Sequence, residues 1–316
     1  MNVRPLYLKE DDVRQLVSVS EAVAALEAAF NAQAAGAAVS NPRQRLRMSG
    51  AMLHLMAAQI PGYFGYKAYT TTASRTQFLF FLFDAHTTEL LAVMEADALG
   101  QIRTGAATGL ATRLLSSSDA AEAILFGAGW QAESQLLGMA AVRDLKRVWI
   151  VNRNPERARA FIERMQPLVR AELAPAAAAD TAVETSQIVT TITSSREPVL
   201  KGEWLQPGCH INAAGGNSLL RRELDDRAVL RARTIVVDSV EQAKIEAGEF
   251  TGVIESGKRH WQDFVELREL LAGRSGRTDP GDITLFKSLG LALEDVAVGA
   301  LVYERALERG VGQRML

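Results

Sequence analysis

Two glycines and an alanine stand at a spacing that suits phosphate binding. The apolar run AILF at residues 123–126 is followed by Gly127, Gly129 and Ala132, in the pattern G-x-G-x-x-A. The first glycine allows a tight turn, the second lets backbone approach a pyrophosphate, and the third small residue lets a helix pack closely on a strand. Phosphates then lie at the positive N-terminal end of that helix. The motif also fits a plain strand-to-helix turn, but the flanking pattern favours dinucleotide binding.

The next apolar run ends in the polar stretch VNRN, residues 151–154. An NAD site usually has Asp or Glu at this point to bind the ribose hydroxyls, whereas a ribose 2′-phosphate attracts a cation. Asn152 and Arg153 suit the phosphate better, so we expect NADP as cofactor and keep NAD as the alternative. Arg153 could instead be a solvated loop residue or stack on adenine.

Four cations stand in surroundings that suit a carboxylate ligand. Lys67 lies among aromatic and apolar residues, Arg103 lies in a run of small and apolar residues, and Arg43 and Arg45 share one face of an extended run. A buried cation needs a partner. The carboxylate of an amino or imino acid would supply one, held by an arginine fork with a lysine as a further charge. The alternative is an ion pair within the protein or at its surface.

The elements around the glycine motif alternate between strands and helices. Strands are expected at EAILF, LKRVWIV, SQIVTTIT, CHINA and ARTIVV, and helices follow the glycine turn and at NPERARAFIERM. Such alternation predicts a doubly wound parallel sheet. A further helix is expected over 97–117. The alanine-rich stretch AELAPAAAAD, residues 171–180, is interpreted as a loose connection at the edge.

The first third of the chain has a different pattern. Ser18 and Glu21 stand in capping-box spacing before a helical run that ends at Gly36. Five short runs rich in β-forming residues follow, and DAHTTE at 84–89 is typical of a hairpin connection. The run QFLFFLF, residues 77–83, has no polar alternation and must be covered on both faces. We therefore expect a partner subunit there, in a homodimer.

Composition excludes several classes of protein. The net charge is −2 and the pI about 6.2, without long runs of like charge, so neither nucleic acid nor an anionic membrane is expected as partner. One cysteine and four scattered histidines give no metal-ligand spacing, and we expect no metal. The N-terminal stretch carries charges where a signal peptide has an apolar core, and no window reaches the length of a membrane span. A cytoplasmic location is expected.

Several motifs together carry a resemblance to a known family. The stretches GYKAYT, IRTGAATGLATRLL, FGAGWQA, INAAGGNSLLRREL, VVDSVEQAKIEAGEF and ITLFKSLGLALEDVAVGALVYERA occur in order along nearly the whole chain. The sequence resembles the ornithine cyclodeaminase and mu-crystallin family. The resemblance implies an α/β fold, in which a mixed α/β substrate-binding and dimerisation domain (1–116, with 294–316 returning to it) accompanies a Rossmann domain with a doubly wound parallel sheet (117–293).

The resemblance also assigns roles to residues. Lys67 and Arg103 match the substrate-binding lysine and arginine of the family, and Arg43 or Arg45 matches a further arginine. Asn217 stands where the cyclodeaminase pattern has an aspartate that acts as base, and an asparagine cannot accept a proton at neutral pH. We expect Lys67 and Asn217 to be the catalytic residues. The expected cofactor-binding residues are Thr104, Gly127, Gly129, Gln131, Ala132, Asn152, Arg153, Thr193 and Lys287.

The expected activity follows from these assignments. Reduction of a cyclic imino acid of the Δ1-pyrroline-2-carboxylate type needs no base, because the protonated imine already carries its proton. It therefore ranks before amino-acid dehydrogenation of the alanine dehydrogenase kind and before ornithine cyclodeamination, which needs a base at several steps. A crystallin-like protein that binds a dinucleotide and a ligand without turnover is the alternative outside enzymes.

Three further residues are given structural interpretations. His54 lies in an apolar run and is expected to be a core histidine. Cys209 is expected to be inert. Asp238 could cap the following helix or lie beside the cofactor, and we favour the cap.

Overall fold

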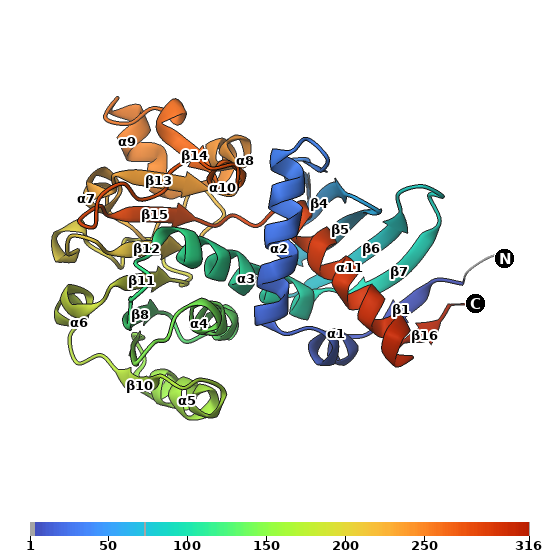
Figure 1. Ribbon diagram of the computed structural model, residues 1–316, viewed down its shortest axis with the longest axis horizontal. Coiled ribbons are helices and arrows are strands. Elements are labelled where there is room, and N and C mark those ends of the chain that lie inside the picture. The colour runs from blue at the N-terminus through green and yellow to red at the C-terminus, as the bar shows by residue number, and fades with distance from the viewer. Residues whose placement is uncertain (1–3, 73, 316) are drawn as a thin grey trace. The chain divides into compact units, whose positions relative to one another are not determined.

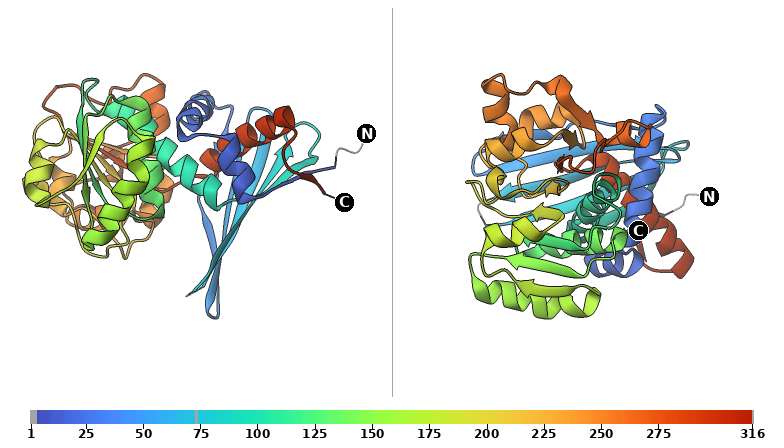
Figure 2. Two further views of the ribbon diagram at one scale, coloured as in Figure 1. Left: turned by 90° about the horizontal axis from the view of Figure 1, so that it is seen from below. Right: turned by 60° about the vertical axis from the view of Figure 1, so that its left-hand side comes forward.

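The computed structural model describes residues 4–72 and 74–315, and the chain divides into two compact units (Figures 1 and 2). The first unit comprises Met1–Arg103 and Gly290–Leu316, and the second is the continuous segment Thr104–Leu289. The first boundary falls inside a long helix, α3 (Asp97–Leu115), rather than at residue 116. Because that helix continues without a break, its sequence gives no local sign of where one unit ends.

The first unit is built on an eight-stranded sheet, in the order β16-β1-β7-β6-β5-β4-β2 with β3 paired to β4. Strands β3 to β7 pair antiparallel, as hairpin connections require, whereas β1 lies parallel to β7. The strands are β1 (Leu6–Leu8), β2 (Val39–Ser40), β3 (Gln44–Met48), β4 (Ala51–Ile60), β5 (Tyr63–Thr72), β6 (Thr76–Asp84), β7 (Leu90–Glu95) and β16 (Gln313–Arg314). The helices are α1 (Glu10–Leu16), α2 (Val19–Ala34) and α11 (Ala292–Arg309).

The start of α2 follows the predicted capping box. The Ser18 side chain accepts a hydrogen bond from the Glu21 backbone N–H, and the Glu21 carboxylate accepts one from the Ser18 backbone N–H. These bonds satisfy donors that a helix start leaves without partners. The predicted helix is confirmed, and so are the five strand-forming runs.

The two faces of this sheet differ. Helices α2 and α11 lie side by side on one face, where α11 covers strands β4 to β6 (Figure 1). Phe80 points to that face, because a Cβ added at Gly299 of α11 would lie 2.3 Å from the Phe80 ring. Side chains alternate along a strand, so Phe81 and Phe83 point to the other face with Tyr66 and Phe64. No described helix of this unit packs against these half-buried rings.

The second unit contains a parallel eight-stranded sheet in the order β10-β9-β8-β11-β12-β15-β13-β14. Its strands are β8 (Glu122–Phe126), β9 (Arg147–Val151), β10 (Glu172–Pro175), β11 (Ile188–Thr191), β12 (His210–Ala213), β13 (Thr234–Val237), β14 (Phe264–Glu266) and β15 (Thr284–Lys287). The longer helices are α4 (Trp130–Val142) and α5 (Pro155–Met165), and shorter ones are α6 (Ala179–Thr185), α7 (Asp226–Arg231), α8 (Val240–Glu246), α9 (Thr251–Glu255) and α10 (Leu267–Leu271). Two apolar clusters form its core. The predicted doubly wound sheet is confirmed.

The interpretation of residues 171–180 as a loose connection is wrong. Strand β10 pairs parallel with β9 from Glu172 to Pro175, and α6 begins at Ala179. The strand lies at the edge of the sheet, where Pro175 removes no ladder hydrogen bond that another strand needs. Only one residue of this strand, Leu173, is buried, and that pattern is too weak to indicate a strand.

No described helix is both long and apolar enough to cross a membrane. The charged N-terminal stretch begins in residues 1–3, which lie outside the described residues. The cytoplasmic location stays a prediction.

Candidate functional site: a dinucleotide turn and a buried charge cluster

The glycine motif forms the tight turn between β8 and α4. Gly127 has φ +121°, and a Cβ there would lie 2.4 Å from the Ile192 carbonyl oxygen, so a side chain is excluded on both grounds. Gly129 is the N-cap of α4, and a Cβ there would meet no atom within 4 Å. Ala132 is buried against the sheet. The turn therefore leaves open space at the positive end of a thirteen-residue helix, which suits a pyrophosphate.

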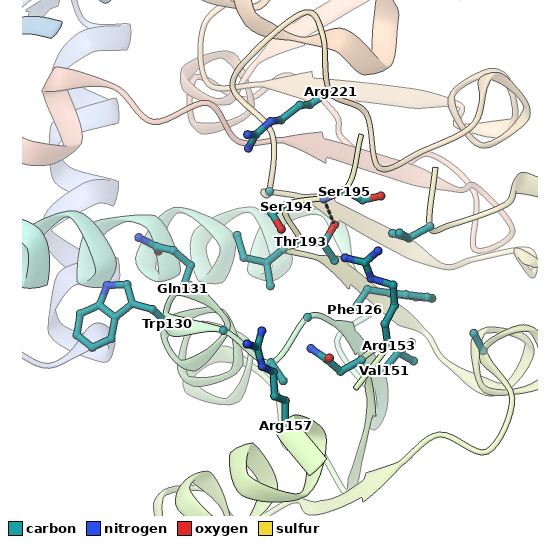
Figure 3. A pocket seen from close by; sticks show the side chains of 18 residues that line it. Phe126, Trp130, Gln131, Val151, Arg153, Arg157, Thr193, Ser194, Ser195 and Arg221 are labelled. Carbon is teal, nitrogen blue, oxygen red and sulfur yellow. Dashed lines mark hydrogen bonds between the residues drawn. The ribbon is translucent and has the colours of Figure 1, made fainter. Parts of the chain in front are cut away.

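A pocket of about 580 Å³ opens over this turn (Figure 3). Six of the predicted cofactor-binding residues line it: Gly127, Gly129, Gln131, Asn152, Arg153 and Thr193. The structure thus brings together residues from the ends of β8, β9 and β11, which are neighbours in the sheet. In a parallel sheet the crevice at the carboxyl ends of the strands, where the strand order reverses, is the usual ligand site. Here the order reverses between β8 and β11.

Sequence reasoning missed two arginines of this pocket. Arg157 in the first turn of α5 and Arg221 in the loop after β12 both line it, and Figure 3 shows them around the pocket with Arg153. Asn154 caps α5 by accepting hydrogen bonds from the N–H groups of Glu156 and Arg157. Arg157 lies four residues after Arg153, and this spacing could have indicated that Arg157 lines the pocket. No sequence pattern near Arg221 indicates that it lines the pocket.

Three of the predicted cofactor-binding residues, Thr104, Ala132 and Lys287, do not line this pocket, and neither does Asn217, which was predicted to be catalytic. Lys287 is fully buried, with its Nζ 3.3 Å from a Glu249 carboxylate oxygen. Asn217 is exposed in the loop after β12, and Thr104 is half-buried in α3. Their roles stay predictions.

Lys67 and Arg103 form a buried charge cluster in the first unit. Lys67 Nζ lies 2.6 Å from Asp295 Oδ1, and Arg103 Nη1 lies 2.8 Å from Glu294 Oε2. Arg103 Nε is 3.2 Å from the same Asp295 oxygen. The alternation of β5 turns Lys67 toward α11, and the two carboxylates stand in the first turn of that helix, where its dipole favours negative charge. Sequence reasoning missed both carboxylates.

Arg43 belongs to the same cluster. Its side chain is buried, and it donates from Nη2 to the Gly290 carbonyl oxygen at 3.1 Å and from Nε to the Met56 sulfur at 3.3 Å. Arg45 is half-buried. The described cluster thus contains three cations, Arg43, Lys67 and Arg103, and two carboxylates, Glu294 and Asp295.

Burial perturbs the ionisation of Lys67. It is 2% exposed, and burial lowers its pKa from 10.5 to about 8, although the Asp295 carboxylate opposes the fall and Arg103 adds to it. Lys67 therefore carries its charge at neutral pH and loses it at moderately alkaline pH.

Three residues with structural interpretations behave as follows. His54 is buried, stacks on Tyr69 and contacts Thr71 through Nε2 at 3.2 Å, and burial lowers its pKa to about 4, so it is neutral at pH 7. Cys209 is buried, and its pKa is raised to about 12 by burial, which keeps the thiol protonated and unreactive. The cap assigned to Asp238 is wrong, because Ser239 caps α8 and Asp238 accepts from the Leu289 N–H.

Comparison with known proteins places the chain in a family. The model of the ornithine cyclodeaminase/mu-crystallin family matches residues 4–310. The chain belongs to this family. The sequence is 37% identical over 236 residues to a Delta(1)-pyrroline-2-carboxylate reductase of Bacillus cereus, which covers 74% of this chain and 72% of that protein.

Two solved structures are similar to this chain over nearly their full length. One is the Thermococcus litoralis Delta(1)-pyrroline-2-carboxylate reductase in complex with NADH and L-proline (TM-score 0.92, 33% identity, 98% of this chain and 100% of that chain). The other is an archaeal alanine dehydrogenase dimer with bound NAD (TM-score 0.91, 33% identity, 99% of each chain).

Among the described residues, no group of three or more His, Cys, Asp or Glu side chains is placed to hold a metal ion.

Replacing Asp295 by Asn should destabilise the protein, because it removes a partner of two buried cations. We expect the free energy of unfolding to fall by about 3–5 kcal/mol at pH 6. The pKa of Lys67 should fall below 8, so the folded variant releases the Lys67 proton at a lower pH than the folded unmodified protein does. In the unfolded chains the lysine titrates alike. The difference in the free energy of unfolding between the two proteins should therefore narrow as the pH rises toward 8.

Urea unfolding at pH 6 and pH 9 measures this deficit. Glu241→Gln, which breaks an exposed pair with Lys244, serves as control and should cost less than about 1 kcal/mol. A deficit for Asp295→Asn that grows between pH 6 and pH 9 would contradict the assignment of Lys67 as the titrating group.

Proposed function

We propose that this protein is an NAD(P)H-dependent oxidoreductase that reduces a cyclic imino acid of the Δ1-pyrroline-2-carboxylate type. The observation that carries the proposal is the buried charge cluster of the first unit, in which three cations face two carboxylates. Two guanidinium groups and one ammonium group in one buried cluster are the donors that the carboxylate of a small molecule binds. The glycine turn of the second unit supports the dinucleotide part of the proposal, and the names of the similar proteins support the substrate class.

The residues of the cluster divide the work of holding the substrate. An arginine guanidinium can bind a carboxylate through two parallel hydrogen bonds, whereas a lysine ammonium acts as a point charge. Arg43 and Arg103 supply the guanidinium groups, and Arg43 is the better candidate than Arg45 because it is buried with the cluster. Lys67 adds a charge whose strength falls as the pH rises past about 8.

The reaction asks little more of the protein than orientation and exclusion of water. When bound, the reduced nicotinamide supplies a hydride to the imine carbon. The C=N bond becomes a C–N single bond, and its electron pair goes to the nitrogen, which already carries a proton in the iminium form. No protein base is needed for this step, which agrees with an asparagine at position 217. Asn217 would orient the substrate by hydrogen bonding.

The cofactor is proposed to be NADP. The solved relatives contain NAD or NADH, so dinucleotide binding is the coarser statement and the 2′-phosphate is the finer one. No carboxylate stands at the end of β9, where Asn152 Oδ1 accepts the Asn154 N–H and Arg153 lines the pocket. Arg157 adds a second cation from α5.

Arg153→Ala should weaken NADPH binding by about 10- to 100-fold, the usual worth of a hydrogen bond to a charged group, and change NADH binding less than about threefold. Isothermal titration or nicotinamide fluorescence measures both affinities. Arg159→Ala is the matched control, because Arg159 is exposed like Arg153 but lies in α5 and does not line the described pocket. An unchanged ratio of the two affinities would reject NADP selection by Arg153.

The substrate class is tested by a panel of cyclic imines, 2-oxo acids with ammonia, and ornithine, each with NADPH or NADH. We expect oxidation of the cofactor to be fastest with a five- or six-membered cyclic imino acid. Lys67→Ala should abolish it while dinucleotide binding by the second unit persists, which shows that the variant is folded. Asn217→Asp should raise any ammonia release from ornithine by up to about 10² to 10⁴, the range of a general base.

The same panel separates the alternatives. Efficient ammonia release from ornithine without imine reduction would identify a cyclodeaminase. Reduction of 2-oxo acids in the presence of ammonia would identify an enzyme that resembles alanine dehydrogenase. Binding of dinucleotide without any turnover would favour the crystallin-like binding protein.

The protein is further proposed to be a homodimer through the open face of the first unit's sheet. Tyr66, Phe81, Phe83 and Phe64 stack there as neighbouring rings, with centroids 4.7 to 6.1 Å apart. A row of half-buried aromatic side chains is the kind of patch that interfaces cover. The similar archaeal alanine dehydrogenase is described as a dimer.

Replacing Tyr66 and Phe81 together by Lys should convert the dimer into a monomer at micromolar concentration. The two lysines of one subunit would be buried at the interface against the same two lysines of the other subunit. Sedimentation velocity measures the change, and Glu163→Lys on α5 is the control for added positive charge. A stable monomer of the unmodified protein at this concentration would reject the dimer.

A further inference from the structure

A buried carboxylate lies beneath the dinucleotide pocket without being part of it. Glu223 stands in the loop between β12 and α7 and is 1% exposed. Its Oε1 accepts a hydrogen bond from the Thr193 backbone N–H at 2.5 Å. Its Oε2 accepts one from the Gly215 backbone N–H and one from Thr191 Oγ1, both at 2.8 Å. One side chain therefore receives three hydrogen bonds.

The three donors come from two separate segments that form a wall of the pocket. Thr191 and Thr193 stand at the end of β11 and Gly215 follows β12, and both Thr193 and Gly215 line the pocket. The two segments are also in close contact, because a Cβ at Gly215 would lie 2.5 Å from the Thr193 carbonyl oxygen and equally close to Glu223 Oε1. Glu223 ties these two segments together at the point where they meet.

Lys287 supports this carboxylate from below. Burial raises the pKa of Glu223, and the Lys287 charge is the largest influence that opposes this rise. Lys287 Nζ is itself 3.3 Å from Glu249 Oε2, while Glu249 Oε1 accepts from the Glu223 N–H at 3.3 Å. Glu249 belongs to a short 3₁₀ turn, Gly248–Phe250. The buried Lys287 thus compensates the negative charge of two carboxylates, Glu223 and Glu249, rather than lining the pocket.

The order of the strands indicates which half of a bound dinucleotide lies against this wall. Asn152 and Arg153, the residues suited to the adenosine ribose, stand at the end of β9 on one side of the glycine turn. A dinucleotide spans the point where the strand order reverses, between β8 and β11. The half that carries the nicotinamide must then lie over the ends of β11 and β12.

We propose that Glu223 is a positioning residue that fixes the wall for the nicotinamide half of the cofactor by tying the Thr191–Thr193 segment to Gly215. This inference rests on the dinucleotide binding proposed above and on no particular substrate. Glu223 does not touch the cofactor. It acts through two backbone N–H groups and one hydroxyl, whose places it sets.

Glu223→Gln is the informative change, because it keeps the size of the side chain. A glutamine amide has one acceptor oxygen, and its NH₂ group would face an N–H or O–H donor. At least one of the three bonds must therefore break. Glu223→Asp keeps two acceptor oxygens but is one methylene shorter, and it should recover part of the effect.

The test compares the affinity of the whole dinucleotide with that of the same molecule without its nicotinamide. The probes are NADPH and 2′-phospho-ADP-ribose, with NADH and ADP-ribose as the second pair, measured by isothermal titration. In the unmodified protein the nicotinamide should increase the affinity. In Glu223→Gln this gain should fall by about tenfold or more, while the affinity for the truncated probe changes less than about twofold.

Activity gives a second readout on the same variants. A misplacement of reacting groups by about 1 Å can cost about 10² in rate. Glu223→Gln should therefore lower kcat more than it raises KM for the imino acid, with Glu223→Asp in between. Val265→Ala on the far edge strand β14 is the control for lost stability, since it should leave the affinity gain unchanged.

The outcomes are distinct. Equal losses for the whole and truncated probes would show a merely structural role for Glu223 and overturn the inference. An unaltered affinity gain in Glu223→Gln would overturn it too. If the unmodified protein binds neither probe of either pair, the proposed dinucleotide site is rejected and the inference falls with it. A loss of the gain in a protein that reduces no imine would support Glu223 and reject only the proposed substrate.

Discussion

The burial of Lys67 and Arg103 is the constraint on which the first unit depends. Cations this deeply placed destabilise a fold unless opposite charges accompany them, and here Asp295 and Glu294 do so at 2.6 and 2.8 Å. Those carboxylates lie more than 190 residues further along the chain. The last helix must therefore return to the first sheet. The discontinuous makeup of this unit is thus an electrostatic requirement as much as a packing one.

The same pairing affects how the cluster can bind a ligand. A site made only of cations would bind many anions and would cost much free energy when empty. With Asp295 and Glu294 in place, Lys67 and Arg103 keep charged partners when no ligand is bound. The buried charges of these two cations are therefore compensated by the protein itself.

Much of the fold and part of the site could be predicted from local patterns. The turn at Gly127 and Gly129 follows from residue spacing alone, because only glycine tolerates its backbone angle and its close contact with Ile192. The capping box at Ser18 likewise depends on two residues, Ser18 and Glu21, three positions apart. Features of this kind depend mainly on residues that are close together in the sequence, so the sequence alone predicts them.

Other features depend on contacts between distant residues and gave no such signal. Glu294 and Asp295 begin an amphipathic helix, where acids usually face water, and nothing nearby indicates burial. Glu223 follows two arginines in a polar loop and reads as exposed, yet it is almost wholly buried. Strand β10 exists because β9 offers it an edge to pair with. In each case the tertiary partner, rather than the residue's own neighbours, decides the outcome.

The division of the chain also sets an order of events during synthesis. Residues 104–289 form one continuous unit, so every strand of the parallel sheet has been synthesised before α11. The antiparallel sheet begins earlier but ends later, because strand β16 at residues 313–314 completes its edge beside β1. Until α11 arrives, Lys67 has no Asp295 and stays hydrated. Domains usually fold from the N-terminus onward as they emerge. In this protein the continuous second unit can finish first, and the N-terminal part of the first unit must wait for residues 290–314.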